Sequence, residues 1–314
     1  MNRAFIFPGQ GSQRVGMGRA LAEASPAARQ VFDQVDEALG EPLSRLVFEG
    51  PEAELTLTEN AQPALMAVSL AVVRALEAEG GFRLAERCRF VAGHSLGEYS
   101  ALCAAGALTL ADTARLLRRR GRAMQQAAPA GEGAMAALIG VDLAAAETVA
   151  QAAAETGVCA VANDNAPGQV VVSGARAAVE RAMALAPEHG ARRAIALPVS
   201  APFHCPLMAP AAAVMKEALA ETALAAPGVP LIANVSAAPV EDPVTIRRLL
   251  VEQVTAMVRW RESVLYMRDA GVDTLIEVGA GKVLTGLARR IDRGLTGRAV
   301  ETPEEIETLL ATLH

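Results

Sequence analysis

The chain has 314 residues, of which 52% are hydrophobic and 20% charged, a composition typical of a well-packed globular protein rather than a disordered one. A net charge of −6 and an aromatic content of 3% argue against nucleic acid as a partner, and the charge also argues against an anionic membrane. The start lacks a signal-peptide pattern, and the longest apolar run, ALMAVSLAVV, is too short to cross a bilayer, so we expect a cytoplasmic protein.

Apolar runs typical of strands alternate with longer helical patterns, which predicts an α/β fold with a mainly parallel sheet. The first part of the chain predicts strands at 3–7 and 89–93, helices at about 61–79 and 110–127, and a helix that begins directly after Ser95. Four cysteines with neither a CxxC pair nor metal-ligand spacing predict reduced thiols and no metal site.

The pattern of elements changes after residue 128. Residues 129–198 follow the order β-α-β-β-α-β, which is that of a ferredoxin-like unit. We therefore expect a discontinuous large α/β domain, residues 1–128 and 199–314, with a small ferredoxin-like domain, residues 129–198, inserted into it. The last part of the chain predicts strands at 229–235 and 272–279 and an amphipathic helix over 302–313, capped by its first threonine.

The segment VAGHSLGEYS contains the spacing G-x-S-x-G at Gly93, Ser95 and Gly97. An apolar strand precedes it and a helical pattern follows, so the glycines predict a sharp strand-to-helix turn that exposes the Ser95 hydroxyl as a nucleophile. The backbone N–H of Leu96 would then lie at a helix N-terminus, where it stabilises an oxyanion. This context makes the large domain α/β-hydrolase-like; the alternative is a tight turn without chemistry.

A nucleophilic serine needs a base, and the chain has four histidines. His94 would point away from its neighbour on a tight elbow, His189 lies in a polar loop, and His314 is the last residue. His204, in the irregular segment SAPFHCPLM, is the best base by elimination; the alternative is a structural histidine. A triad would need an acid from among Asp112, Asp142 and Asp164, none of which is distinguished by its context. A Ser–His dyad oriented by a backbone carbonyl is equally consistent.

One arginine of the segment LLRRRGRAMQQ lies on the wrong side of its predicted helix. At about 100° per residue, Arg115, Arg118, Arg119 and Arg122 share one face, which predicts a solvated surface. Arg120 instead falls within the apolar stripe. A guanidinium in that place must extend to solvent or pair with an anion.

Two glycine-rich segments follow predicted strands. FPGQGSQ, residues 7–13, lacks the lysine and spacing of a phosphate-binding P-loop, and its Gln10 N–H could serve an oxyanion near Ser95. The default alternative is a plain structural turn. EVGAGKVLTGL resembles a phosphate loop only superficially, and we interpret it as structural.

In combination, the motifs FPGQGSQ, GHSLGEYSAL, RRGRAMQQA, APGQVVVSG, PFHCPLM and IEVGAGKVL resemble the malonyl-CoA:acyl carrier protein transacylases and the related acyltransferase domains of fatty-acid and polyketide synthases. The motifs occur in family order over essentially the whole chain. The resemblance implies a ping-pong transfer of malonyl from malonyl-CoA to acyl carrier protein, as a monomer, with no cofactor and no metal.

The resemblance also implies a role for each matching position. Ser95 would be the nucleophile and His204 its base, with the N–H groups of Gln10 and Leu96 as the oxyanion hole. Arg120 would bind the malonyl carboxylate. The remaining implied positions are Gln253, whose backbone carbonyl would orient the histidine, and three residues that would line the cleft, namely Asn163, Asn165 and Phe203. The bulk of Phe203 favours malonyl over branched acyl groups.

Several alternatives share parts of this pattern. A trans-acting acyltransferase of a polyketide or malonate decarboxylase system would use the same chemistry with another carrier. A serine esterase or acyl hydrolase would share the elbow but has little use for Arg120 in an apolar stripe. A non-catalytic scaffold would not need Ser95, His204 and Arg120 together. An acidic carrier protein would need a local basic patch, for which Arg118, Arg119 and Arg122 are candidates, although a solvated face is the more ordinary interpretation.

Overall fold

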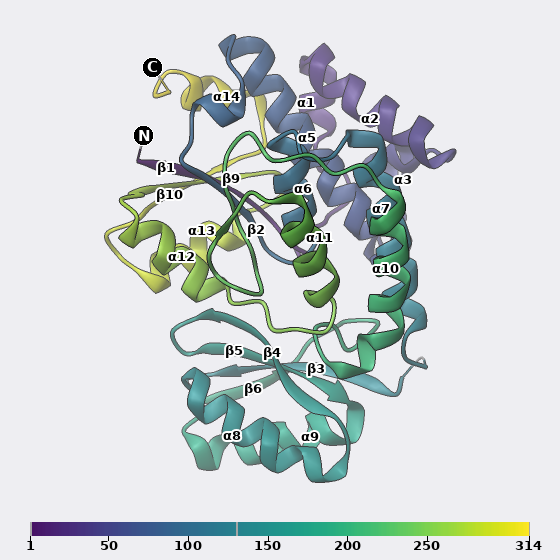
Figure 1. Cartoon of the computed structure of the whole chain (residues 1–314), viewed down its shortest axis with the longest axis vertical. Coiled ribbons are helices and arrows are strands. Elements are labelled where there is room, and N and C mark those ends of the chain that lie inside the picture. Colours follow the sequence, from purple (N-terminus) through teal and green to yellow (C-terminus); the bar gives the residue numbers. More distant parts are fainter. Residues whose placement is uncertain (1, 130, 314) are drawn as a thin grey trace.

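The computed structural model describes residues 2–129 and 131–313 and contains two separate β-sheets. The six-stranded sheet lies in a larger unit, in which the chain both begins and ends, and the four-stranded sheet lies in a smaller unit at one end of the molecule (Figure 1). The predicted α/β class is confirmed.

The six-stranded sheet is parallel except for one edge strand. Its order is β10-β9-β1-β2-β7-β8, and only β8 runs antiparallel to its neighbour. The strand predicted at 229–235 is reduced to two residues, because the chain turns back at once, with Ala237 N–H bonded to the carbonyl of Ala233 at 2.8 Å. The strands are β1 (Arg3–Phe7), β2 (Phe90–Gly93), β7 (Leu231–Ile232), β8 (Pro239–Val240), β9 (Thr274–Val278) and β10 (Thr296–Val300).

Alternate residues of β1 enter two different cores, as the twofold period of a strand requires. Phe5 and Phe7 belong to the larger core, and Ala4 and Ile6 to the smaller one on the opposite face. Both faces of the sheet are therefore buried at its centre, which explains why β1 and β2 are almost continuously apolar in sequence.

Helices cover both faces of this sheet (Figure 1). Helices α12 and α13 supply the smaller core, and the N-terminal helices with α6 and α7 supply the larger. The C-terminal helix has the predicted threonine cap, with Thr302 and Glu305 in a reciprocal capping box. The helices are α1 (Arg19–Ala24), α2 (Pro26–Leu39), α3 (Leu43–Glu49), α4 (Glu52–Thr56), α5 (Thr58–Gly80), α6 (Gly97–Ala104), α7 (Leu110–Gln126), α10 (Ala209–Glu221), α11 (Pro243–Glu252), α12 (Trp260–Asp269), α13 (Val283–Ile291) and α14 (Pro303–Leu310), with short 3₁₀ turns η1 (Leu84–Glu86) and η4 (Pro206–Met208).

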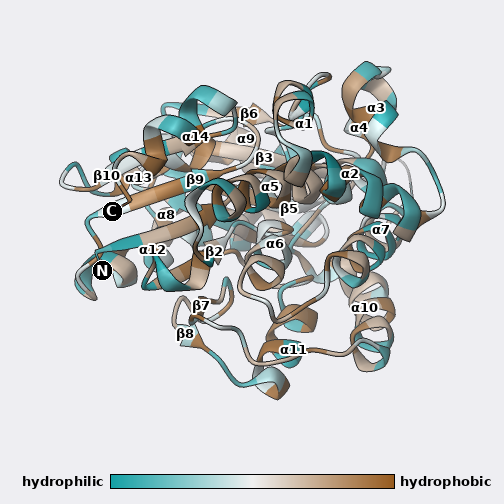
Figure 2. Cartoon of the chain, turned by 90° about the horizontal axis from the view of Figure 1, so that it is seen from above, coloured by the Kyte–Doolittle hydropathy of each residue, from teal (hydrophilic) through white to brown (hydrophobic). Residues whose placement is uncertain are grey.

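Helix α5 is the central helix of the larger unit. Figure 2 shows it in the middle of the molecule with α2, α6 and α7 around it. It begins three residues earlier than predicted and spans 23 residues, and the whole helix is long and apolar enough to cross a membrane by length and composition alone. However, 83% of its most apolar window is buried within the protein, as in a core helix.

The smaller unit has the predicted order β-α-β-β-α-β. Its strands form an antiparallel sheet in the order β4-β5-β3-β6, and both helices pack on the face turned away from the larger unit (Figure 1). The elements are β3 (Gly133–Ile139), α8 (Leu143–Ala153), η2 (Ala154–Thr156), β4 (Cys159–Ala166), β5 (Gln169–Ala175), α9 (Arg176–Leu185), η3 (Ala186–His189) and β6 (Arg193–Ala196).

Strand β4 fastens the two units together. Asp164 N–H donates to the carbonyl of Val258 at 3.0 Å, and Val258 N–H donates to Ala162 at 2.9 Å. The buried Asp164 carboxylate also pairs with Arg261 of α12 at 2.8 Å. These contacts fix β4 beside the carboxyl end of β2, where parallel α/β sheets place their ligands.

Candidate active site

Ser95 lies on a strained turn between β2 and α6. Its φ of 54° is in the left-handed region, which a serine rarely adopts outside functional sites. Both glycines of the motif are required by close packing, since a Cβ on Gly93 would lie 1.9 Å from the carbonyl oxygen of Gly97, and one on Gly97 would lie 2.3 Å from that of Phe7. The turn thus raises the Ser95 hydroxyl above the sheet edge, as the motif predicts.

The structure brings His204 to this hydroxyl. Ser95 Oγ lies 2.8 Å from His204 Nε2, and His204 Nδ1 lies 2.9 Å from the backbone oxygen of Gln253. A carbonyl only accepts, so Nδ1 carries the proton and Nε2 is free to accept from Ser95. The described residues place no carboxylate against His204, so this is a dyad oriented by a backbone carbonyl. Asp112 lies in the first turn of α7, where its backbone N–H donates to the capping residue Thr109, Asp142 caps α8, and Asp164 pairs with Arg261.

The surroundings keep His204 neutral. Burial of the ring, and secondarily the charge of Arg120, lower the His204 pKa from 6.5 to about 3, against a smaller opposing effect of the Gln253 hydrogen bond. A neutral imidazole is the form that accepts a proton.

Two residues that line the same cavity have backbone N–H groups without an acceptor in the described part of the chain. Gln10 and Leu96 both line it, and neither N–H donates a hydrogen bond within residues 2–129 and 131–313. The side chain of Gln10 is turned aside, its amide oxygen accepting from Thr58 Oγ1 at 2.7 Å. An oxyanion formed on a carbonyl attached to Ser95 would find both donors unoccupied.

Arg120 is 1% exposed and points at the nucleophile. Its Nη2 donates to Ser95 Oγ at 3.1 Å and to Gln253 Oε1 at 2.8 Å, and its Nη1 donates to Gln62 Oε1 at 2.7 Å. In the described part of the chain all three acceptors are uncharged, so the guanidinium has no carboxylate in contact. A buried cation held in this way is prepared for an anionic ligand.

The cavity above Ser95 has a volume of about 420 Å³ and is lined by residues from both units. Asn163 and Asn165 of β4 reach it from the smaller unit, and Phe203 lies at its wall, 8% exposed, next to His204. His94 turns away from the serine, as predicted for a supporting residue, and its Nε2 lies 2.8 Å from Asn165 Oδ1. The small sheet therefore contributes one wall of the cavity.

Three buried polar residues that the sequence analysis missed support this site. Gln62 holds Arg120, while Asn234 accepts from Ser95 N–H at 2.8 Å and donates to the Gly93 carbonyl at 2.7 Å. Glu98 accepts from the Gln253 side chain at 2.7 Å. Glu98 directly follows the G-x-S-x-G motif, so its place in the first turn of the following helix could have been predicted from the sequence. Nothing in the sequence around Gln62 or Asn234 indicates that these residues belong to the site.

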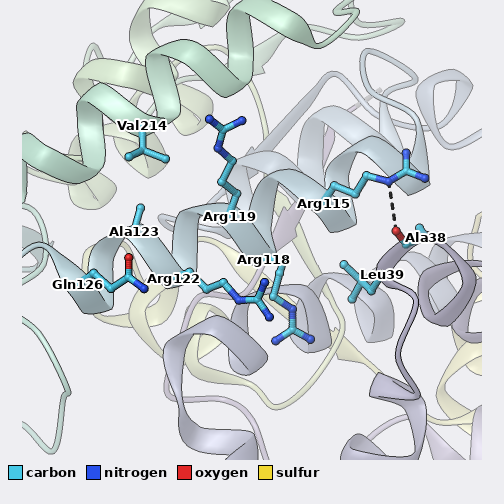
Figure 3. A pocket seen from close by; sticks show the side chains of 9 residues that line it. All are labelled: Ala38, Leu39, Arg115, Arg118, Arg119, Arg122, Ala123, Gln126 and Val214. Carbon is cyan, nitrogen blue, oxygen red and sulfur yellow. Dashed lines mark hydrogen bonds between the residues drawn. The ribbon is translucent and has the colours of Figure 1, made fainter.

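The predicted arginine face of α7 lies on the other side of the helix from this cavity. Figure 3 shows Arg115, Arg118, Arg119 and Arg122 spreading over a hollow beside Ala38, Leu39 and Val214. The prediction that Arg118 is solvated is wrong: it is 7% exposed because α2 and α5 cover it, and it pairs with Glu41 and with the carbonyl of Glu59. Arg122 pairs with Glu59 at 2.8 Å.

The described residues contain no group of three or more histidine, cysteine, aspartate or glutamate side chains that could hold a metal ion. The four cysteines are free thiols, three of them buried. His314 lies outside the described residues.

The fold and the arrangement of Ser95, His204 and Arg120 suit acyl transfer, and comparison with known proteins gives the family. Residues 4–301 match the acyl transferase domain family, to which this chain belongs. The malonyl CoA-acyl carrier protein transacylase of Bacillus subtilis is 49% identical over 311 residues, covering 99% of this chain and 96% of that protein.

Solved structures agree with this assignment. An acyl-carrier-protein-S-malonyltransferase from Bartonella henselae has a TM-score of 0.97 and 58% identity, covering 100% of this chain and 99% of the other. A malonyl-transacylase in complex with a type II PKS acyl-carrier protein has a TM-score of 0.96 and 41% identity, covering 99% of this chain and 100% of the other. The chain is an acyltransferase.

Proposed function

We propose that this enzyme transfers the malonyl group of malonyl-CoA to the phosphopantetheine thiol of acyl carrier protein and so supplies fatty-acid synthesis in the cytoplasm. The observation that carries the proposal is the position of Arg120, whose guanidinium lies 3.1 Å from Ser95 Oγ in a buried site. An esterase needs the nucleophile and the base but has no use for a cation beside them. A malonyl ester of Ser95 carries its free carboxylate two carbons from the ester carbon, within reach of that cation.

Acylation of Ser95 is the first half of the reaction. His204 Nε2 takes the proton of the hydroxyl as Ser95 Oγ attacks the thioester carbon, and the N–H groups of Gln10 and Leu96 bind the resulting oxyanion. The tetrahedral adduct then expels the CoA sulfur, which takes the proton from His204. The Gln253 carbonyl holds the imidazole in the required tautomer throughout.

The second half reverses these steps with a different thiol. His204 removes the proton of the phosphopantetheine thiol, the sulfur attacks malonyl-Ser95, and Ser95 leaves with the proton returned by His204. Every proton and charge in this cycle is held by a residue of the chain, so the proposed reaction uses no cofactor. We propose that residues 129–198 form a separate domain, through which Asn163, Asn165 and the small sheet limit the access of water.

The proposal is tested by single turnover. Protein mixed briefly with malonyl-CoA should gain the mass of one malonyl group, and should lose it when holo acyl carrier protein is added, with malonyl recovered on the carrier. Ser95→Ala should gain nothing. Release of CoA without an adduct or a loaded carrier would instead establish a hydrolase.

A polyketide carrier is a second candidate recipient, favoured by the 41% identical transacylase solved with a type II PKS acyl-carrier protein. Competition between a fatty-acid and a polyketide carrier for malonyl-loaded enzyme would separate the two. A higher kcat/KM for the fatty-acid carrier supports the first proposal.

A further inference from the structure

Glu98 is a buried acid that does not reach the cavity. It lies in the first turn of α6, is 1% exposed, and is not among the residues that line the site above Ser95. Burial raises the Glu98 pKa to about 7, although hydrogen bonds from Gln253 and Asn234 and the charge of Arg120 partly offset this effect. Burying a carboxyl costs free energy of folding, so we expect Glu98 to make a contribution to the neighbouring site.

The position of this carboxyl is fixed by the backbone. Glu98 Oε2 accepts from the backbone N–H of Asn234 at 3.2 Å, and the Asn234 side chain is itself bonded to Ser95 N–H and to the Gly93 carbonyl. Glu98 is therefore tied to the rigid elbow rather than to a mobile surface segment.

Glu98 helps to determine which way the Gln253 amide faces. Gln253 Nε2 donates to Glu98 Oε2 at 2.7 Å and to the Ser95 carbonyl at 3.0 Å, which leaves Gln253 Oε1 directed at Arg120 Nη2 at 2.8 Å. If the amide were reversed, the NH₂ group of Gln253 would face the guanidinium NH₂ of Arg120, and the amide oxygen of Gln253 would face the carboxylate oxygen of Glu98. The carboxyl, at the shorter distance, and the Ser95 carbonyl together select the orientation that holds the guanidinium.

The base depends on a different part of Gln253. His204 Nδ1 donates to the backbone carbonyl, whose position is set by the end of α11, where Gln253 N–H bonds to Leu249. The side chain of Gln253 therefore serves Arg120, and its main chain serves His204.

We infer that Glu98 is a specificity-determining positioning residue, which acts through the Gln253 side chain to hold Arg120 in the orientation that binds the malonyl carboxylate. This inference rests on the proposed function. Its consequence is selective: loss of Glu98 should impair transfer of a thioester that carries a carboxylate more than transfer of one that does not.

The test compares rates of Ser95 acylation by malonyl-CoA and by acetyl-CoA, measured by intact mass in the full-length protein. Glu98→Met removes the acceptor at similar volume, and Glu98→Gln keeps an oxygen for Gln253 Nε2. Glu277→Met is the matched control, because Glu277 is also a fully buried carboxyl bonded to two backbone N–H groups, those of Leu284 and Thr285, away from the cavity.

Glu98→Met should lower the preference for malonyl over acetyl about tenfold to a hundredfold, the effect of losing one hydrogen bond to a charged group. Glu98→Gln should restore the preference to within about threefold of wild type, since its amide oxygen still accepts from Gln253. Glu277→Met should leave the preference unchanged even where its Tm falls.

A preference that stays within about threefold of wild type in Glu98→Met, or equal losses with both thioesters, overturns the inference while the proposed function stands. A wild-type protein that forms no malonyl-Ser95 overturns both. If Glu98→Met does not fold, Gln253→Met removes the contact with Glu98 together with the contact with Arg120, and keeps the backbone carbonyl. It should show the same loss of preference, and an unchanged preference there also overturns the inference.

Discussion

Replacement of Arg120 by alanine should convert a malonyl-selective site into one that accepts unsubstituted acyl groups. Arg120 is 1% exposed and its three acceptors are neutral, so a malonyl carboxylate in the wild-type site pairs with a cation that has no other anion in contact. Removing one partner of a buried ion pair strands the other and costs about 3–5 kcal/mol. At 1.36 kcal/mol per tenfold, malonylation of Ser95 should slow by about 150-fold or more.

The acetyl group of acetyl-CoA has no carboxylate that could lose its partner, so the rate of acetylation of Ser95 should stay the same or rise. In wild type an acetyl group leaves the guanidinium unpaired beside it, and Arg120→Ala removes that penalty. The assay is rapid mixing of each thioester with the protein, acid quench and intact-protein mass, with Ser95→Ala as the blank. Arg119→Ala is the matched control, because this arginine precedes Arg120 on α7 but its side chain is 41% exposed and faces Glu217 and Glu221.

Arg120 does not bind the malonyl carboxylate if Arg120→Ala remains folded and keeps the wild-type ratio of malonyl to acetyl rates to within about threefold. The same conclusion follows if Arg119→Ala changes that ratio as much as Arg120→Ala does. In either case the carboxylate would be bound elsewhere in the cavity, and the contact between Arg120 and Ser95 would have another purpose.

Three further outcomes follow from the geometry of the site. Because the His204 pKa is lowered to about 3, His204 should contribute no inflection near pH 6.5 to the rate of Ser95 acylation. Since the Glu98 pKa is about 7, the profile is measured in Glu98→Gln as well, and a step near pH 6.5 that persists there would contradict the burial of His204. The same shift of the His204 pKa means that His204 lowers the stability of the fold as the pH falls from about 6.5 toward 3, since only the unfolded chain then binds the proton. Gly93→Ala should lower the free energy of unfolding, measured by urea titration, by about 3 kcal/mol, because the new Cβ would lie 1.9 Å from the Gly97 carbonyl oxygen. Gly286→Ala is the control: its Cβ would have no atom within 4 Å, so the substitution should be neutral or stabilising. Phe203→Ser should widen the cavity beside His204 and raise the rate with methylmalonyl-CoA relative to malonyl-CoA, and an unchanged ratio would remove Phe203 from substrate selection.

The sequence predicts the parts of the site that depend on local geometry. The elbow at Ser95 was predictable because a strand, two glycines and a helix within a few residues leave the chain little choice. Arg120 was predictable from helical phase alone, since a single helix determines on which side each residue lies. The expected dyad of Ser95 and His204 rested on elimination, and the structure supplies the 2.8 Å contact that elimination could not.

The parts that sequence reasoning missed depend on residues far apart in the chain. Asn234 bonds to Ser95, 139 residues away in the chain, and Glu98 bonds to Gln253, 155 residues away. Neither contact produces a periodic pattern in the sequence. The burial of Arg118 was likewise not predictable from the sequence around it. Helical phase correctly separates it from Arg120, but only tertiary packing decides that α2 and α5 cover it.

The charge of Arg120 links recognition of the substrate to the strength of the base. In the free site this charge is the second-largest cause that lowers the His204 pKa, after burial. A malonyl carboxylate that pairs with Arg120 neutralises this charge, so the imidazolium formed as Ser95 attacks is destabilised less than it would be beside the free cation. An acetyl group brings no such compensation. Selectivity for malonyl should therefore arise in the transition state of acylation as well as in binding. It should appear in the maximal rate of acylation, and not only in the thioester concentration at which half of that rate is reached.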